Sequence, residues 1–341
     1  MSDHIMQQIL AILADGKNLP QEMAVRGFQV MMNGGATPAQ MGAFLMGLRM
    51  KGETADEIAA GVIAMRAKAR AITAPPGAID TCGTGGDAQG TFNISTAVAF
   101  VLAACGVPVV KHGNRSVSSQ SGSADVLAAL GVKLEADVPV LERCLERCGI
   151  CFLMAPKFHP AMRHVAPVRQ ELGMRTIFNV LGPLSNPAGP DFQLLGVYRA
   201  ELVETLAQVL MQLGTKAAWV VHGDGGMDEL SLSGPSRVAA LKDGAIAYFE
   251  VSPEDAGLPR ASTQMLKGGD AAFNAKAMTE ALSGVESAYR NAVLYNAAAG
   301  LIVAGKAADL KAGVAMAMEA IDSGEAYRRL RLLAEVSYER V

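Results

Sequence analysis

The sequence lacks the features that would direct it to nucleic acid or into a membrane. The formal net charge of the 341 residues is −3, and no basic tail or arm is present to attract nucleic acid. The longest apolar run, TAVAFVLAACGVPVV, is too short for a membrane span and contains Gly and Pro. The first residues, MSDHIMQQIL, show no charged-then-apolar signal pattern. We therefore expect a cytoplasmic protein that binds neither nucleic acid nor a membrane and holds anionic ligands through local groups of backbone amides, Lys and Arg.

Cysteine is scarce as well. Five cysteines in a chain of this size, without a leader, indicate reduced thiols. Cys144, Cys148 and Cys151 have the C-x3-C-x2-C spacing of radical-SAM iron–sulfur ligation. The surrounding VPVLERCLERCGICF, however, has the pattern of an amphipathic helix that ends at Gly149 and is followed by a strand. Cys151 then lies beyond the helix, and we interpret the three thiols as small packing residues.

Residue sets of several common catalytic sites are also missing. No Gly-Lys-[Ser/Thr] follows the glycine-rich stretch, which excludes a P-loop. No set of residues in the sequence indicates a Ser-His-Asp catalytic triad. His159 and His164 lack the spacing of a helical zinc pair and have no nearby Cys, so we expect His159 to face a substrate and His164 to form an ion pair or cap.

The hydrophobic periodicity along the chain predicts an α/β protein with two domains. Residues 1–74 show helical periodicity, with capping boxes beginning at Thr37 and Thr54, and TAPPGA provides a linker. From residue 75 to 341, strands, glycine turns and helices alternate, which predicts a central mixed, mostly parallel β-sheet flanked by helices. LKDGAI predicts a hairpin, and GGDA at 268–271 is interpreted as a surface turn. The expected strands are 78–82, 107–111, 150–154, 193–198, 217–222, 237–241 and 245–251.

The stretch DTCGTGGD, at 80–87, carries the first functional signal. A strand leads into it and a helix follows, so Gly83, Gly85 and Gly86 let backbone amides approach a phosphate at a helix N-terminus. The match to the dinucleotide fingerprint G-x-G-x-x-G/A requires an acid at the end of the next strand. That strand, VPVVKHG, ends near Lys111 instead, which disfavours a nicotinamide dehydrogenase and suits a second phosphate.

A second polar loop and an acidic pair complete the pattern. Lys111, Arg115 and five serines lie within the thirteen residues 111–123, and a long Gly/Ser loop inside a compact α/β domain is usually functional. Both loops follow strands that should end at the same edge of the sheet, where such folds bind ligands. Asp228 and Glu229 follow the strand AAWVVHG. Mg²⁺ commonly takes one or two carboxylates plus phosphate oxygens and waters, so this pair predicts a magnesium site.

Four long motifs give the chain a family resemblance. GTGGDAQGTFNIST, KHGNRSVSSQSGSADVL, APKFHPAMRHVAPVRQELGMRTIFNVLGPLSNPA and HGDGGMDELS resemble the anthranilate phosphoribosyltransferases of tryptophan biosynthesis, in the same order and over nearly the whole chain. A more distant resemblance is to thymidine and pyrimidine-nucleoside phosphorylases. The resemblance implies Mg²⁺-dependent transfer of 5-phosphoribose from phosphoribosyl pyrophosphate to the anthranilate amine, with release of pyrophosphate.

The resemblance also implies roles for residues of the motifs. Anthranilate should meet Gly83, His112, Asn114, His159 and Arg169. One Mg²⁺ should be held by Ser95 and Glu229 and a second by Asp228 and Glu229. Phosphoribosyl pyrophosphate should be bound by Gly83, Gly86, Asp87, Thr91, Asn93, Ile94, Ser95, Thr96, Lys111, His112, Gly113, Asn114, Arg115, Ser116, Val117, Ser118, Ser119 and Ser123.

The family further implies a homodimer formed through the small helical domain, which residues 165–190 rejoin. The residues themselves favour direct displacement at the ribose anomeric carbon, because no credible nucleophile accompanies the anion-binding groups; Lys111, Asp228 and Glu229 would stabilise charge. A pyrimidine-nucleoside phosphorylase-like enzyme or a nucleic-acid-binding relative of the fold would be the alternatives.

Overall fold

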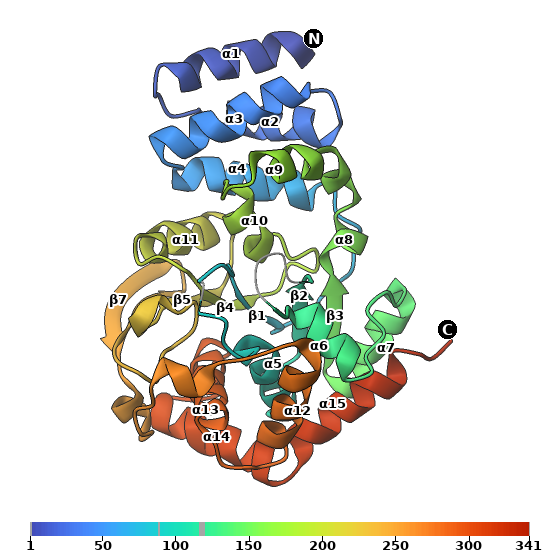
Figure 1. Cartoon of the computed structure of the whole chain (residues 1–341), viewed down its shortest axis with the longest axis vertical. Coiled ribbons are helices and arrows are strands. Elements are labelled where there is room, and N and C mark those ends of the chain that lie inside the picture. Colours follow the sequence, from blue (N-terminus) through green and yellow to red (C-terminus); the bar gives the residue numbers. More distant parts are fainter. Residues whose placement is uncertain (1, 88, 116–119, 341) are drawn as a thin grey trace.

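A helical bundle sits on top of a larger α/β unit (Figure 1). The structure is a computed structural model and describes residues 2–87, 89–115 and 120–340. The bundle is built from four N-terminal helices and from two helices of the middle of the chain, which pack against α3 and α4. The bounds of these six helices are α1 Ser2–Ala14, α2 Gln21–Met32, α3 Pro38–Lys51, α4 Ala55–Arg66, α9 Ala166–Leu172 and α10 Phe178–Leu184.

Both predicted capping boxes are present. The Thr37 side chain accepts from the N–H of Gln40, and Thr54 from that of Glu57, with the reciprocal bonds in place. The Glu57 carboxylate is buried and also binds Lys51 Nζ at 2.6 Å. These local bonds satisfy backbone donors that the first turn of a helix leaves without partners, and so they set where α3 and α4 begin.

The sheet of the larger unit has seven strands in the order β3-β2-β1-β4-β5-β6-β7. The first five pair in parallel and the last two are antiparallel, so the predicted mixed, mostly parallel sheet is confirmed. β2 begins after Pro108, two residues later than predicted, because proline has no N–H to donate to a ladder. The strand bounds are β1 Ile79–Gly83, β2 Val109–Gly113, β3 Ile150–Met154, β4 Phe192–Gly196, β5 Ala217–His222, β6 Ser236–Lys242 and β7 Ala245–Val251.

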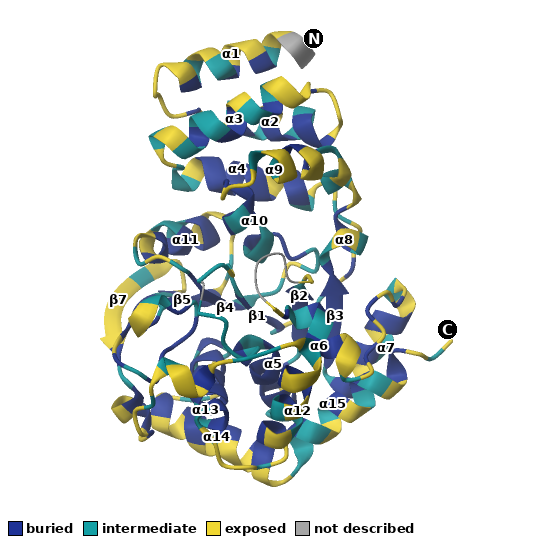
Figure 2. Ribbon diagram, in the orientation of Figure 1, coloured by how far each residue is buried: buried dark blue, intermediate teal, exposed yellow. Residues whose placement is uncertain are grey.

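Helices cover both faces of this sheet. α11 lies on the face toward the bundle, whereas α5 and α13 lie on the other face and are buried along most of their length (Figure 2). The remaining elements are short turns of helix between strands and a run of helices at the C-terminus. The bounds are α5 Ile94–Ala104, α6 Ser123–Ala129, α7 Val138–Cys148, α8 Ala155–Phe158, η1 Pro160–His164, α11 Glu201–Gln212, η2 Asp224–Gly226, η3 Pro253–Ala256, η4 Thr263–Leu266, α12 Ala271–Leu282, α13 Ala288–Val303, α14 Leu310–Asp322 and α15 Glu325–Val336.

The two faces of the sheet belong to different hydrophobic cores. Leu194, Trp219 and Val221 point into the core formed with α5 and α13, while their neighbours Leu195 and Val220 point into the core of the bundle. This alternation follows from the two-residue period of a strand. The bundle therefore shares its core with one sheet face.

All five cysteines are free thiols, as expected from their number. Cys144 and Cys148 lie on α7 and Cys151 lies on β3, all within the core. Among the described residues, no group of three or more His, Cys, Asp or Glu side chains is arranged to hold a metal ion. No helix in the described part of the chain is long and apolar enough to cross a membrane.

Candidate active site

Three glycines at the carboxyl edge of the sheet make room for the acidic pair. Gly83 and Gly196 are partners at the ends of β1 and β4, and Gly223 follows β5. A Cβ at Gly83 would overlap the Asp228 carboxylate, one at Gly196 the Asp228 carbonyl, and one at Gly223 the Glu229 carbonyl. The segment carrying Asp228 and Glu229 thus lies directly on the sheet edge, because these glycines have no side chains.

Backbone amides from the glycine loop and from the helix that follows it bind the carboxylates. The N–H of Gly85 donates to Asp228 Oδ2 at 2.7 Å, and the N–H of Ser95, in the first turn of α5, donates to Glu229 Oε1 at 3.1 Å. The charge of Asp87 acts on Asp228 and raises its pKa. Asp87, Ser95, Asp228 and Glu229, predicted from separate motifs, therefore form one cluster.

Burial raises the pKa of both acids. Desolvation, followed by the charge of Asp87, raises the pKa of Asp228 to about 7. Desolvation and the charge of Asp228 raise the pKa of Glu229 to about 8. A divalent cation between these groups would favour their charged forms. The oxygen donors suit Mg²⁺, which would complete its shell with water and substrate oxygens.

Lys111 lies beneath this cluster. It is 2% exposed, and its Nζ donates to the Thr81 carbonyl at 2.5 Å and approaches Ser95 Oγ at 3.4 Å. Burial lowers the pKa of Lys111, opposed first by the charge of Asp80, whose own pKa is raised by burial to about 6. Lys111 therefore supplies positive potential from below and does not line the open cavity.

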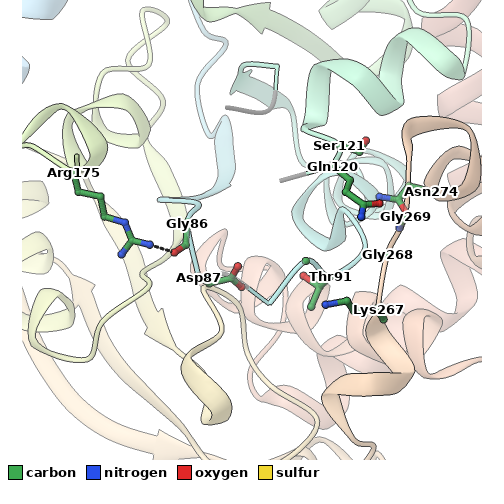
Figure 3. Close-up of a pocket in the computed structure, with 11 residues that line it drawn as sticks. Gly86, Asp87, Thr91, Gln120, Ser121, Arg175, Lys267, Gly268, Gly269 and Asn274 are labelled. Atoms are coloured by element: carbon green, nitrogen blue, oxygen red, sulfur yellow. Dashed lines mark hydrogen bonds between the residues drawn. The ribbon is translucent and has the colours of Figure 1, made fainter. Parts of the chain in front are cut away.

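A cavity of about 270 Å³ opens beside the cluster (Figure 3). Three of its lining residues, Gly86, Asp87 and Thr91, were predicted to bind substrate. Among the described residues, its lining consists of Gly86, Asp87, Gly90, Thr91, Gln120, Ser121, Arg175, Lys267, Gly268, Gly269 and Asn274.

Sequence reasoning missed two cations of this cavity, which contact the glycine loop from different elements. Arg175 comes from the segment between α9 and α10; its guanidinium donates to the Gly86 carbonyl and lies 4.3 Å from the centre of the Tyr198 ring. Lys267 follows η4, and its Nζ donates to the Gln89 carbonyl at 3.1 Å. Arg175 belongs to a motif that was quoted for the family resemblance, whereas nothing local marked Lys267.

The turn at 268–271 is more than the surface feature that was expected. The N–H of Gly268 donates to the Gly90 carbonyl at 2.9 Å, and Lys267 forms an isolated antiparallel β-bridge with Thr91. The buried Asn274 side chain donates to Asn93 Oδ1 at 3.0 Å. The turn therefore forms a wall of the cavity, and no signal in its own sequence indicated this long-range pairing.

The structure brings together two predicted histidines from different elements. The rings of His112, on β2, and His159, after α8, have centroids 5.1 Å apart. Burial lowers the pKa of His112 to about 3 and that of His159 to about 4, so both are neutral at pH 7. Each ring bonds to a backbone group, of Gly182 and of Ser185 respectively, and each Nε2 is buried without a partner among the described residues.

The other predicted residues have varied surroundings. Arg169 packs over Phe178, with its guanidinium carbon 5.3 Å from the ring centre, and burial lowers its pKa. Arg115 is turned toward Asp125 at 3.0 Å. The Asn114 side chain accepts from the N–H of Arg115 at 2.8 Å.

Ile94 and Thr96 are buried in the first turn of α5, so the Ile94 side chain serves the core. Gly113 lies close to Ser123, since a Cβ there would overlap the Ser123 hydroxyl. Ser116, Val117, Ser118 and Ser119 lie outside the described residues.

Comparisons with known proteins agree with this architecture. Residues 7–69 match the helical bundle domain of a glycosyl transferase family, and residues 75–327 match its α/β domain. An anthranilate phosphoribosyltransferase of Rhodopseudomonas palustris (strain BisA53) is 56% identical over 331 residues, 97% of this chain and 98% of that protein. One from Rhodospirillum rubrum is 56% identical over 318 residues, 93% and 92% of the two chains.

Solved structures are similar over nearly the whole chain. The anthranilate phosphoribosyltransferase of Thermus thermophilus superimposes with a TM-score of 0.92 at 44% identity, covering 97% of this chain and 99% of that one. That of Saccharomyces cerevisiae, in complex with PRPP and Mg, gives 0.89 at 27% identity and covers 97% of each chain. The chain belongs to the anthranilate phosphoribosyltransferases, pentosyltransferases of this glycosyl transferase family.

Proposed function

We propose that the protein transfers 5-phosphoribose from phosphoribosyl pyrophosphate to the amine of anthranilate, giving N-(5-phosphoribosyl)anthranilate and pyrophosphate, in tryptophan biosynthesis. The observation that carries this proposal is the acidic pair of half-buried Asp228 and buried Glu229, held by the amides of Gly85 and Ser95 beside a cavity lined by the glycine loop. Such a site suits a substrate that presents phosphate oxygens to a divalent cation.

Charge stabilisation is the main contribution of this chain's residues. Asp228, Glu229 and the Ser95 hydroxyl would hold up to two Mg²⁺ ions, which when bound neutralise charge that develops on the departing pyrophosphate. Lys111 adds positive potential from beneath Ser95 at 3.4 Å. The glycine loop, with Gly83, Gly86, Asp87, Thr91 and Asn93, would position the ribosyl diphosphate for direct displacement at the anomeric carbon.

Anthranilate would bind near the histidine pair. His112 and His159 are neutral and keep unpartnered Nε2 atoms that can accept a hydrogen bond. An arylamine is already neutral near pH 7, so it needs orientation more than deprotonation. Gly83, Asn114 and Arg169 would complete this subsite, with the Arg169 guanidinium as the partner for the carboxylate of anthranilate.

The remaining features of the proposal concern the whole molecule. We place the substrate cleft between a helical domain, residues 1–74 with 165–190, and an α/β domain, residues 75–341. We also propose a homodimer formed through the helical domain and a cytoplasmic location, consistent with five free thiols.

The test is the loss of anthranilate fluorescence when phosphoribosyl pyrophosphate and Mg²⁺ are added to the purified protein. Loss that depends on all three components is expected. A folded, metal-replete protein that leaves the fluorescence unchanged would refute the proposal. Turnover of a pyrimidine nucleoside with free phosphate, measured in parallel, would instead indicate the phosphorylase-like alternative.

A further inference from the structure

We propose that Lys267 binds a phosphate group of the substrate directly, so that Lys267 and the turn at 268–271 form a second anion-binding wall beside the glycine loop. This inference rests on the proposed function and adds to it a residue outside the four motifs that suggested it. The ligand chemistry is a phosphate ester or diphosphate, which phosphoribosyl pyrophosphate carries at its two ends.

The charge of the cavity is the first argument. Of the lining residues that the structure describes, Asp87, Arg175 and Lys267 carry charge and the others do not. The charge of Asp87 acts on Asp228, whose pKa it raises, and the two cations Arg175 and Lys267 line the same cavity (Figure 3). A net positive lining in a chain of net charge −3 favours an anionic ligand at this place.

The available partners of Lys267 are the second argument. Its Nζ donates to the neutral Gln89 carbonyl at 3.1 Å and, within the described chain, forms no ion pair with a carboxylate. Lys276, nine residues later on α12, instead lies 3.9 Å from Glu280 and has a side chain that is 78% exposed. An ammonium carries three donors, so Lys267 can keep its carbonyl contact and still bind a phosphate oxygen.

Rigid placement of the turn is the third argument. A Cβ on Gly268 would lie 2.8 Å from the Thr91 carbonyl oxygen, so only glycine allows this close approach. Asn274 Oδ1 accepts from the N–H of Gly269 at 2.8 Å, while its Nδ2 binds Asn93. The Phe92 ring stacks between Phe273 and Tyr289, with centroids 5.8 and 4.5 Å away.

These bonds also define what the turn contributes. The N–H groups of Gly268 and Gly269 are both used within the protein. The wall therefore offers the ammonium of Lys267 and no free amide from these two glycines. Its charge, more than its backbone, should determine phosphate affinity.

The experiment compares wild type with K267Q, K267R and the matched surface control K276Q in steady-state kinetics. We expect K267Q to raise the KM for phosphoribosyl pyrophosphate about tenfold, with kcat and the KM for anthranilate within about twofold of wild type. K267R, which keeps the charge, should recover most of the affinity, and K276Q should match wild type. Thermal unfolding of each variant checks that it folds.

Inhibition by Mg²⁺-pyrophosphate and by ribose 5-phosphate, measured separately, identifies which phosphate Lys267 contacts. Weakened inhibition of K267Q by one of them, by about tenfold, supports the proposal. An unchanged KM and unchanged inhibition would overturn it. A fall in kcat alone that K267R does not restore would also overturn it and assign Lys267 to positioning of the glycine loop. If wild type itself does not turn over, the proposed function fails; if wild type is active and K267Q equals it, only this inference fails.

Discussion

The acidic pair and the histidine pair respond oppositely to the same environment. Desolvation is the largest cause in both places, yet it raises the pKa of Asp228 and Glu229 and lowers that of His112 and His159. Burial disfavours whichever form is charged. At pH 7 the histidines are therefore neutral as they stand, whereas the carboxylates need a cation to become fully charged. This difference is consistent with the proposed roles, in which the acidic pair binds a metal–phosphate group and the histidine pair an aromatic amine.

The largest expected effect comes from removing one charge of the acidic pair. Glu229→Gln keeps the size of the side chain but removes a proposed ligand for Mg²⁺, so kcat should fall by about 10²–10³-fold, in the range that loss of one electrostatic group produces. His159→Asn should act mainly on the KM for anthranilate. Steady-state kinetics over a range of Mg²⁺ concentrations measure both effects.

Two outcomes would contradict the contrast between the pairs. Unchanged pyrophosphate release in Glu229→Gln would remove the metal assignment. A loss of kcat in His159→Asn as large as that in Glu229→Gln would show that the histidines take part in the chemistry. Glu280→Gln, on the exposed face of α12, provides a matched control.

A change of one methyl group tests how the fold positions the acids. In Gly196→Ala the new Cβ would overlap the Asp228 carbonyl, and the segment must shift off the sheet edge. We expect the free energy of unfolding to fall by about 2–3 kcal/mol, as for other overpacked sites, with loss of Mg²⁺-dependent activity. Urea denaturation measures the former.

The control for this substitution is Gly42→Ala on α3. A Cβ there meets nothing within 4 Å, and alanine favours a helix by up to about 1 kcal/mol. Equal stability of the two variants would show that the glycine at the end of β4 is not needed for the close approach of Asp228.

We also expect a pH dependence of opposite sign at the two pairs. The histidines have lowered pKa values, so the unfolded chain binds more protons below its own pKa of about 6.5, and stability is lost as pH falls. Going from pH 7 to 5 should cost on the order of 2 kcal/mol per histidine. A His112→Asn/His159→Asn variant should lack this loss.

In metal-free protein the acids act in the opposite direction. Their raised pKa values mean that the folded state holds the extra protons, so their contribution is fully present at low pH and is lost as pH rises through about 7 for Asp228 and about 8 for Glu229. Relative to wild type, Asp228→Asn should therefore be less stable at pH 5 than at pH 8. Chemical denaturation at several pH values, in the presence of a chelator, measures this stability difference. The comparison would be contradicted if, relative to wild type, the stabilities of Asp228→Asn and of His112→Asn/His159→Asn changed with pH in the same direction.

Local sequence patterns were sufficient for most of the fold. The capping boxes at Thr37 and Thr54 and the strand alternation are short-range features, and each carries its own physical signal. The acidic pair and the first two loops could be found because glycines and charged residues follow apparent strands. Arg175, Lys267 and Asn274 could not be found in this way. Each reaches the cavity through a hydrogen bond to a residue far away in the sequence, at separations of 89, 178 and 181 positions respectively.

The sequence by itself determined which segments become helices and strands, and its long motifs determined the family. The tertiary structure alone decided that Gly83, Gly196 and Gly223 leave space for Asp228 and Glu229 and that Lys111 lies within reach of Ser95. It also decided that Lys267 and the turn at 268–271 form a wall of the cavity. The physical reason is that periodicity and capping act over a few residues. Steric overlap, desolvation and hydrogen bonds between distant strand ends exist only after the sheet has brought those ends together.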